Sequence, residues 1–175
     1  TTLGIGLYGH NGHQLAGDTA LAGAQIVASC DGGAMPTSVR IHATLTELIA
    51  DPSVQLVSIC APQRATQVDA IRLVLRAGKH VLAEKPMVMR HDELDEVMAL
   101  AHLRGCQLFD MAGIADEAPY AAIPPLLAQG AVGTIGQIVV RKSYQYAPWR
   151  PQDERSEEHT SELQSRQYLV CRLLL

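Results

Sequence analysis

AGKHVLAEKP, residues 77–86, predicts a helix end at its glycine, a short apolar strand over 80–83, and then the charged pair Glu84-Lys85 before Pro86. Ligands of open parallel sheets bind at the carboxyl ends of the strands, so Glu84 and Lys85 are expected to contact a ligand. Pro86 fixes the backbone directly after them. A surface ion pair at a strand exit, which contributes little to stability, is the equally open alternative.

A glycine-bearing turn, GHNGHQ over 9–14, follows a first predicted strand at 3–8. It is expected to open a helix that ends near Gly23. This layout places a pyrophosphate at the helix N-terminus, where free N–H groups and the helix dipole favour negative charge. The fingerprint G-x-G-x-x-G is incomplete, because Asn11 and Gln14 stand at its second and third glycine positions. An ordinary strand-to-helix turn is the alternative.

The next predicted strand, over 26–30, ends at Asp31, about twenty residues after the first glycine of the turn. An acidic side chain at this position can accept hydrogen bonds from both hydroxyls of an adenosine ribose, and it would repel the extra phosphate of NADP. NAD is therefore expected as the cofactor rather than NADP. The alternative is that Asp31 only begins the turn made by Gly32 and Gly33, because Asp-Gly is itself a turn signal.

Strand and helix signals continue to alternate along the chain. The predicted elements after Asp31 are a helix with capping-box spacing over 44–50, a buried strand over 54–60, a helix over 64–77, the strand over 80–83, a helix over 92–104 and a strand over 106–111. Ala61-Pro62 ends the buried strand, and Pro62, which lacks an N–H for a strand ladder, fits an exit that faces a ligand cleft. At least five βα alternations predict an α/β fold with a doubly wound parallel sheet, the Rossmann architecture.

Two domains are expected in this order. Residues 1–115 are predicted to form the dinucleotide-binding domain, and 175 residues allow only one full core. Residues 116–154 are predicted to hold a connecting helix and a Gly-rich turn over 117–136 and a strand over 138–146, which is the start of a second α+β domain.

Composition excludes several classes of protein. The net charge is −4 and there is no run of Lys or Arg, so a nucleic-acid partner is not expected. A membrane role is not expected either, because no apolar run approaches about 20 residues and the first residues lack the basic region and apolar core of a signal peptide; the predicted location is the cytoplasm. The four cysteines, which are widely spaced, are expected to be reduced and buried. His10 and His13 are interpreted as loop residues near a phosphate, and no metal is expected.

DPSVQLVSICAP, residues 51–62, and AGKHVLAEKP together resemble the N-terminal NAD-binding domain of the Gfo/Idh/MocA family of nicotinamide-dependent oxidoreductases, over about 3–138. The resemblance implies hydride transfer between NAD and a small-molecule sugar, polyol or similar hydroxyl substrate, and a homo-oligomer at full length. It places Lys85 beside the nicotinamide ribose and the reacting carbon, as the catalytic residue that orients and polarises the oxygen. The residues expected to bind the cofactor are Gly9, His10, Asn11, Gly12, Asp31, Ala61, Pro62, Glu84 and Lys85.

Three departures from the family pattern keep other functions open. Asn11 and Gln14 alter the glycine turn, and Thr66 stands where many members carry a histidine. The Asp and His, spaced D-x-x-x-H, that the family's second domain supplies are absent from the sequence, so the fragment itself is expected to be inactive. A non-catalytic NAD-binding regulatory or scaffold module is the alternative, and an unrelated Rossmann protein is a third reading.

The last 21 residues differ in character from the rest. RSEEHTSELQS, residues 155–165, resembles the in-frame translation of a short-read sequencing adapter, and LVCRLLL, residues 169–175, resembles the far end of that adapter. Residues 155–175 are therefore interpreted as a non-native tail on a gene fragment.

Overall fold

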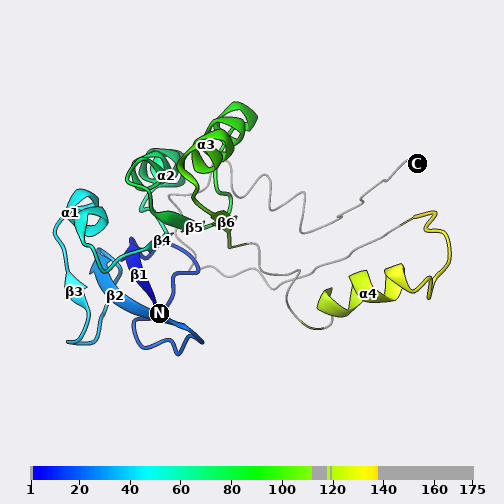
Figure 1. The fold of residues 1–175 in the computed structure, drawn as a ribbon, viewed down its shortest axis with the longest axis horizontal. Helices are drawn as coiled ribbons and strands as arrows, with labels where there is room; N and C mark the ends of the chain where they lie inside the picture. The colour runs from blue at the N-terminus through cyan, green and yellow to red at the C-terminus, as the bar shows by residue number, and fades with distance from the viewer. Residues whose placement is uncertain (1, 112–117, 119, 138–175) are drawn as a thin grey trace, which may run out of the picture. The chain divides into compact units, whose positions relative to one another are not determined.

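The computed structural model describes residues 2–111, 118 and 120–137 of the chain (Figure 1). Contacts between residues divide the chain into two compact units, 1–113 and 114–175. This division falls two residues before the predicted boundary at 115, and the assignment of domains itself stays a prediction. The predicted strand over 138–146 and the tail over 155–175 lie outside the described residues.

Six parallel strands form the sheet of the first unit. They are β1 Leu3–Tyr8, β2 Ala24–Cys30, β3 Arg40–Ile41, β4 Leu56–Ile59, β5 His80–Ala83 and β6 Leu108–Asp110. Their order in the sheet is β3-β2-β1-β4-β5-β6. The chain runs outward from β1 to β3, returns across the sheet, and runs outward again from β4. This is the doubly wound order of the Rossmann architecture, so the predicted fold class is confirmed.

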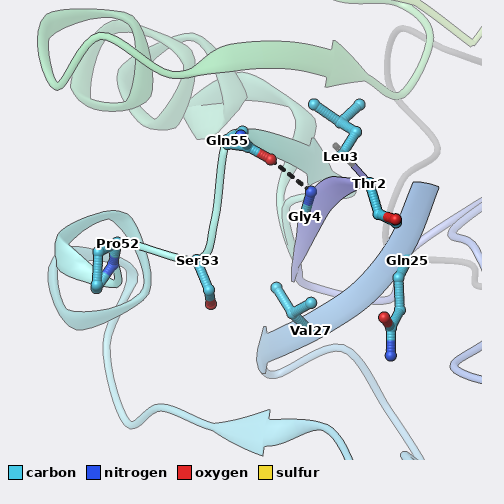
Figure 2. A pocket seen from close by; sticks show the side chains of 8 residues that line it. All are labelled: Thr2, Leu3, Gly4, Gln25, Val27, Pro52, Ser53 and Gln55. Carbon is cyan, nitrogen blue, oxygen red and sulfur yellow. Dashed lines mark hydrogen bonds between the residues drawn. The ribbon is translucent and has the colours of Figure 1, made fainter. Parts of the chain in front are cut away.

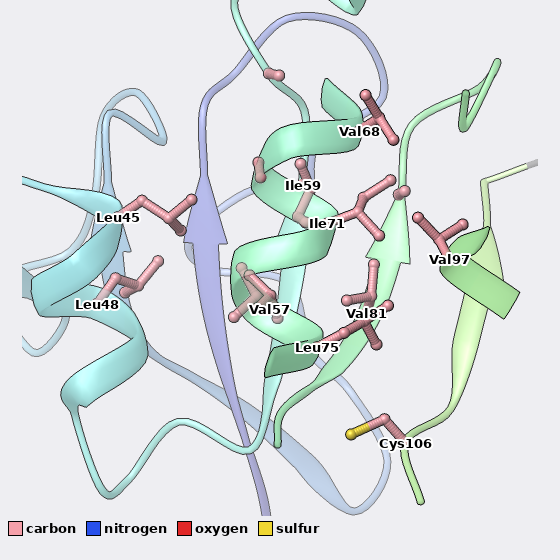
Figure 3. Packing of buried hydrophobic residues seen from close by; sticks show 14 of the residues in the cluster. Leu45, Leu48, Val57, Ile59, Val68, Ile71, Leu75, Val81, Val97 and Cys106 are labelled. Carbon is pink, nitrogen blue, oxygen red and sulfur yellow. The ribbon is translucent and has the colours of Figure 1, made fainter. Parts of the chain in front are cut away.

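Three helices cover one face of this sheet. They are α1 Leu45–Ala50, α2 Gln67–Arg76, which the short 3-10 turn η1 Arg64–Thr66 precedes, and α3 His91–Arg104. All three contribute to one core with β4 and β5. Figure 3 shows Ile71 of α2 next to Ile59 and Val81 of the sheet. Fully burying an Ile or Val side chain contributes roughly 1.5–3 kcal/mol, so this face holds most of the apolar stabilisation.

Helix ends follow the sequence signals closely. Thr44 caps α1, because its Oγ1 accepts a hydrogen bond from the Glu47 amide at 3.1 Å. The Glu47 carboxylate accepts from the Ala43 amide at 2.9 Å, one residue before the position of an ideal capping box. Gly105, whose φ is 64°, ends α3 in the left-handed conformation that glycine adopts without strain.

The opposite face of the sheet carries no helix within residues 2–111, so the predicted helix that ends near Gly23 is wrong. Residues 9–23 form turns and bends, and this face is covered by side chains from them and from the segment after β2. The physical reason lies in Gly17, which lowers helix stability by roughly 0.5–1 kcal/mol. A Cβ on Gly17 would lie 2.6 Å from Cδ of Pro36, so the coil packs directly on the neighbouring segment.

The described part of the second unit contains two helical segments. These are the 3-10 turn η3 Tyr120–Ala122 and the helix α4 Ile123–Ala128. Two prolines in its first turn suit a helix start, and Gly130, with φ of 70°, follows its end. The described residues of the stretch 117–136 thus contain a helix and then a turn with glycines, as predicted.

Candidate functional site

Four strands of the sheet end at the same edge. Tyr8 of β1 pairs with Cys30 of β2 and with Ile59 of β4, and Ile59 pairs with Ala83 of β5. The residues that follow these strands therefore lie close together, at the point where the strand order reverses between β1 and β4. In open α/β sheets this is the place where ligands bind.

The glycine turn is fastened to both neighbouring strands. The Gly9 amide donates to the Cys30 carbonyl at 3.0 Å, and the Asn11 amide donates to the Cys60 carbonyl at 3.3 Å. Gly9 has φ of 70°, and a Cβ at this position would collide with the Cys60 carbonyl oxygen. The Asn11 side chain donates to the Pro62 carbonyl at 3.0 Å. Four predicted site residues, Gly9, Asn11, Ala61 and Pro62, are thus brought to one edge.

Glu84 lies inside the protein and supports this turn. Its side chain is only 1% exposed, so Glu84 is not a surface residue at the strand exit. One carboxylate oxygen accepts hydrogen bonds from the His13 amide and from Nδ1 of His13, the latter at 2.9 Å. The other oxygen accepts from the Lys85 amide at 2.8 Å. A Cβ on Gly12 would collide with this carboxylate. The absence of a side chain at Gly12 therefore allows Glu84 to approach the turn and form these hydrogen bonds.

Gln14 fills the space under the turn where the fingerprint has a third glycine. Its Nε2 lies 2.9 Å from the Gly9 carbonyl oxygen and 3.1 Å from the Ser58 carbonyl oxygen, and its Oε1 accepts from the Ser58 hydroxyl at 2.5 Å. The side chain thus links the turn to β4.

Asp31 and His10 form the exposed rim of the site. Asp31 follows β2 with φ of 55°, a conformation uncommon for a residue other than glycine, and its carboxylate is 62% exposed. Nδ1 of His10 donates to the Asp31 carbonyl at 2.8 Å, and the carboxylate oxygen Oδ1 lies 3.8 Å from the same nitrogen. The Asp31 carboxylate is therefore accessible to a ligand that rests on the turn.

Gln67 and Arg64 belong to the site, although the sequence analysis did not identify them. Gln67 is fully buried, and its Nε2 lies 2.6 Å from the Glu84 carbonyl oxygen and 3.2 Å from that of Pro86. Its Oε1 accepts from Nη1 of Arg64 at 3.1 Å. The sequence does offer one signal for Gln67, which lies four positions before Ile71 and so belongs to the buried stripe of α2. A polar side chain at a buried position needs hydrogen-bond partners, which indicates a structural or functional role.

Lys85 lies at the same edge, immediately after Glu84, and the peptide bond between Lys85 and Pro86 is cis. Thr66, in contrast, is exposed, and its hydroxyl donates to the Gln63 carbonyl at 3.0 Å.

Cys60 lies beneath the turn. Burial first, and then the Glu84 carboxylate, raise the pKa of its thiol to about 12, so at neutral pH this buried group is a protonated thiol and not a nucleophile.

Burial of three cysteines agrees with the sequence analysis. Cys30, Cys60 and Cys106 are buried and free of disulfides, while Cys171 lies outside the described residues. Within 2–111, 118 and 120–137, no three His, Cys, Asp or Glu side chains are grouped as a metal site. No helix in the same part of the chain has the length and apolar character needed to cross a bilayer.

A separate pocket lies at the amino ends of the strands (Figure 2). Its volume is about 280 Å³, and its lining includes Gly4 and Val27 of the sheet and Ser53 and Gln55 before β4. The Gly4 amide donates to Oε1 of Gln55 at 2.7 Å. Because this pocket lies at the opposite edge of the sheet from the glycine turn, it is not part of the candidate site.

Known proteins share both sequence and fold with this chain. The oxidoreductase family with an NAD-binding Rossmann fold, Gfo/Idh/MocA, matches residues 9–111. An uncharacterized oxidoreductase of Synechocystis is 38% identical over 96 residues, which cover 55% of this chain and 26% of that protein. The 1,5-anhydro-D-fructose reductase of Ensifer adhaerens is 30% identical over 105 residues, which cover 58% of this chain and 31% of the reductase.

A solved NAD-binding protein from Listeria innocua has the same fold, with a TM-score of 0.68 at 18% identity, over 88% of this chain and 49% of that one. The chain thus spans less than a third of the length of the two curated relatives and about half of the solved structure.

Proposed function

Because this chain belongs to the Gfo/Idh/MocA oxidoreductase family, whose NAD-binding Rossmann fold it contains, we propose that it is the cofactor-binding part of an enzyme acting on CH–OH groups. The parent enzyme passes hydride between NAD and a carbon of a sugar, a polyol or a similar hydroxyl compound. The Ensifer relative, a reductase of 1,5-anhydro-D-fructose, supports this substrate class.

One observation carries this proposal. The glycine turn, the exposed carboxylate of Asp31 and the Glu84-Lys85 pair meet at the edge where the strand order reverses. A dinucleotide on this edge would rest its diphosphate on the turn and its adenosine ribose against Asp31. The nicotinamide supplies the hydride chemistry when the cofactor is bound. Residues Gly9, His10, Asn11, Gly12, Ala61 and Pro62 form the floor of this proposed site.

Lys85 is proposed to orient and polarise the reacting oxygen. A lysine ammonium group is a hydrogen-bond donor without acceptor capacity, so it can bind a hydroxyl or carbonyl oxygen. Oxidation of an alcohol also needs a group that takes the hydroxyl proton. The sequence contains no D-x-x-x-H spacing, so this role is assigned to a residue outside the chain.

Direct cofactor binding tests the proposal. NADH and NADPH are titrated into the 175-residue chain, with the nicotinamide fluorescence and the heat of binding as readouts. NADH is expected to bind more tightly, because the Asp31 carboxylate repels a ribose phosphate. Asp31→Ala should reduce this preference, whereas Asp95→Ala, which removes an exposed carboxylate from α3, should leave it unchanged. Failure of both dinucleotides to bind would refute the proposal.

A non-catalytic NAD-binding regulatory or scaffold module is the second candidate. The coil over 9–23, which replaces the expected helix beside the glycine turn, favours it, because that helix normally strengthens diphosphate binding. The two functions differ in turnover. NAD-linked oxidation of polyols by the full-length parent supports the enzyme, and tight NAD binding without turnover of any polyol or sugar supports the module.

A further inference from the structure

The missing helix leaves the proposed diphosphate position short of positive charge. A helix N-terminus carries about half an elementary positive charge and several free N–H groups. Residues 9–23 form turns and bends, so the glycine turn has no helix dipole behind it. The diphosphate of a dinucleotide is anionic at neutral pH, so a cationic side chain near this turn would strengthen its binding.

Arg64 is the side chain in the right place. It begins η1, directly after the exit of β4, and its guanidinium reaches across to the glycine turn. Nη2 donates to the Asn11 carbonyl at 2.8 Å. A Cβ on Gly12 would lie 3.0 Å from the same nitrogen. The guanidinium therefore lies against the turn at the two positions where a diphosphate approaches the backbone.

Several hydrogen bonds fix the position of the Arg64 guanidinium, but one of its donors has no partner among the described residues. Nη1 donates to the Ala61 carbonyl at 3.3 Å and to Oε1 of Gln67 at 3.1 Å, and Gln67 is fully buried. Nε of Arg64 is buried and has no hydrogen-bond partner among the described residues. Buried donors of native proteins are almost always paired, so an unpaired one needs an explanation.

We propose that Arg64 binds the diphosphate of the dinucleotide cofactor, and that its guanidinium supplies the positive charge that a helix N-terminus would otherwise provide. This inference rests on the proposed function, because it concerns the same cofactor. A guanidinium suits the task, because it stays charged at neutral pH and its Nη2, which donates one N–H to Asn11, carries a second N–H for a phosphate oxygen. Gln67 fixes the guanidinium, and the buried Glu84 carboxylate is occupied by His13 and the Lys85 amide.

ADP and adenosine differ only in the diphosphate, so a comparison of their affinities isolates the contribution of the diphosphate to binding. Both ligands are titrated calorimetrically into the wild-type chain and into Arg64→Gln, at low and at high salt. The variant should bind ADP roughly 10- to 100-fold more weakly, because it loses charge-assisted hydrogen bonds, and adenosine within about twofold of the wild type. The salt dependence of ADP binding should also become weaker. Arg64→Lys, which keeps the charge but loses the planar donors, should be intermediate.

Arg76→Gln is the matched control. It removes the same charge from an exposed position at the other end of α2, and ADP binding should be unchanged. Thermal unfolding of each variant identifies any loss of folding, and if Arg64→Gln does not fold, Arg64→Lys carries the test. Equal losses for ADP and adenosine, or none for ADP, would overturn the role of Arg64. If the wild-type chain binds none of NADH, NADPH and ADP, the proposed function fails, and the role of Arg64 fails with it.

Discussion

Replacing Asp51 with Asn should remove a pH-dependent part of the stability. Asp51 follows α1, and its carboxylate is only 2% exposed. It accepts hydrogen bonds from the Ser53 hydroxyl at 2.6 Å, the Ser53 amide at 2.9 Å and Nε2 of His42 at 3.1 Å, and Nη1 of Arg40 lies 3.1 Å away. Burial alone would raise its pKa, but these bonds and the Arg40 charge outweigh burial and lower the pKa from 3.8 to about 2.

The magnitude follows from this pKa. A tenfold change in proton affinity corresponds to about 1.4 kcal/mol, so the depressed pKa of Asp51 contributes roughly 2 kcal/mol to the free energy of unfolding. Because the folded protein holds the Asp51 proton less tightly than the unfolded chain, this contribution is present above the unfolded pKa of about 4 and is lost as the pH falls through about 2.

Urea unfolding followed by circular dichroism measures the effect in the wild type and in Asp51→Asn. The difference in unfolding free energy between the two should be constant above about pH 5 and should shrink by roughly 2 kcal/mol by about pH 2. Subtraction removes the contribution of the other carboxylates. Asp95→Asn, which changes an exposed residue of α3, should give a difference that does not depend on pH. A constant difference for Asp51→Asn would refute the reasoning.

Three further substitutions test the site and the fold. Gly9→Ala should weaken NADH binding by roughly tenfold or more, because its φ of 70° and the Cys60 carbonyl leave no room for a Cβ; calorimetry would contradict this if affinity were unchanged. Thr44→Ala should lower the free energy of unfolding by about 1 kcal/mol through loss of the α1 cap, measured by urea denaturation. Lys85→Ala in the full-length parent should lower kcat/KM for hydride transfer, and an unchanged value would remove its proposed role.

Most of the sheet could be predicted because its strands are short, apolar and separated by clear turns. Residues 54–60 are almost continuously apolar, which parallel strands buried on both faces require, and β4 lies within them. The capping spacing at Thr44 and the glycine at 105 identified helix ends, since both act through their own local backbone. Because all the strands were predicted to be parallel, the site residues that follow them were expected at one edge of the sheet.

Tertiary contacts decided what the sequence could not indicate. The stretch 14–23 contains helix-forming residues, but a short isolated helix is marginal, and packing of Gly17 against Pro36 favours coil. Met98 has the spacing of an inward residue of α3, yet it is 57% exposed because nothing in the described part of the chain covers it. Arg64 donates to the Asn11 carbonyl, 53 positions earlier in the chain, and a bond of this length along the chain leaves no sequence pattern. For Gln67 the buried position on α2 was the one available signal.

Helices cover only one face of the sheet within residues 2–111. We therefore expect the two faces of this domain to differ in their stability against local opening. Amides of β4 lie beneath α2 and should exchange with deuterium only when the whole domain unfolds. The coil over 9–23 covers Leu7 and Ile26 with few regular hydrogen bonds, so local opening can expose them while the helices stay in place. The glycine turn belongs to this coil. A ligand that binds at the turn should therefore slow amide exchange in the coil and in the strands that it covers.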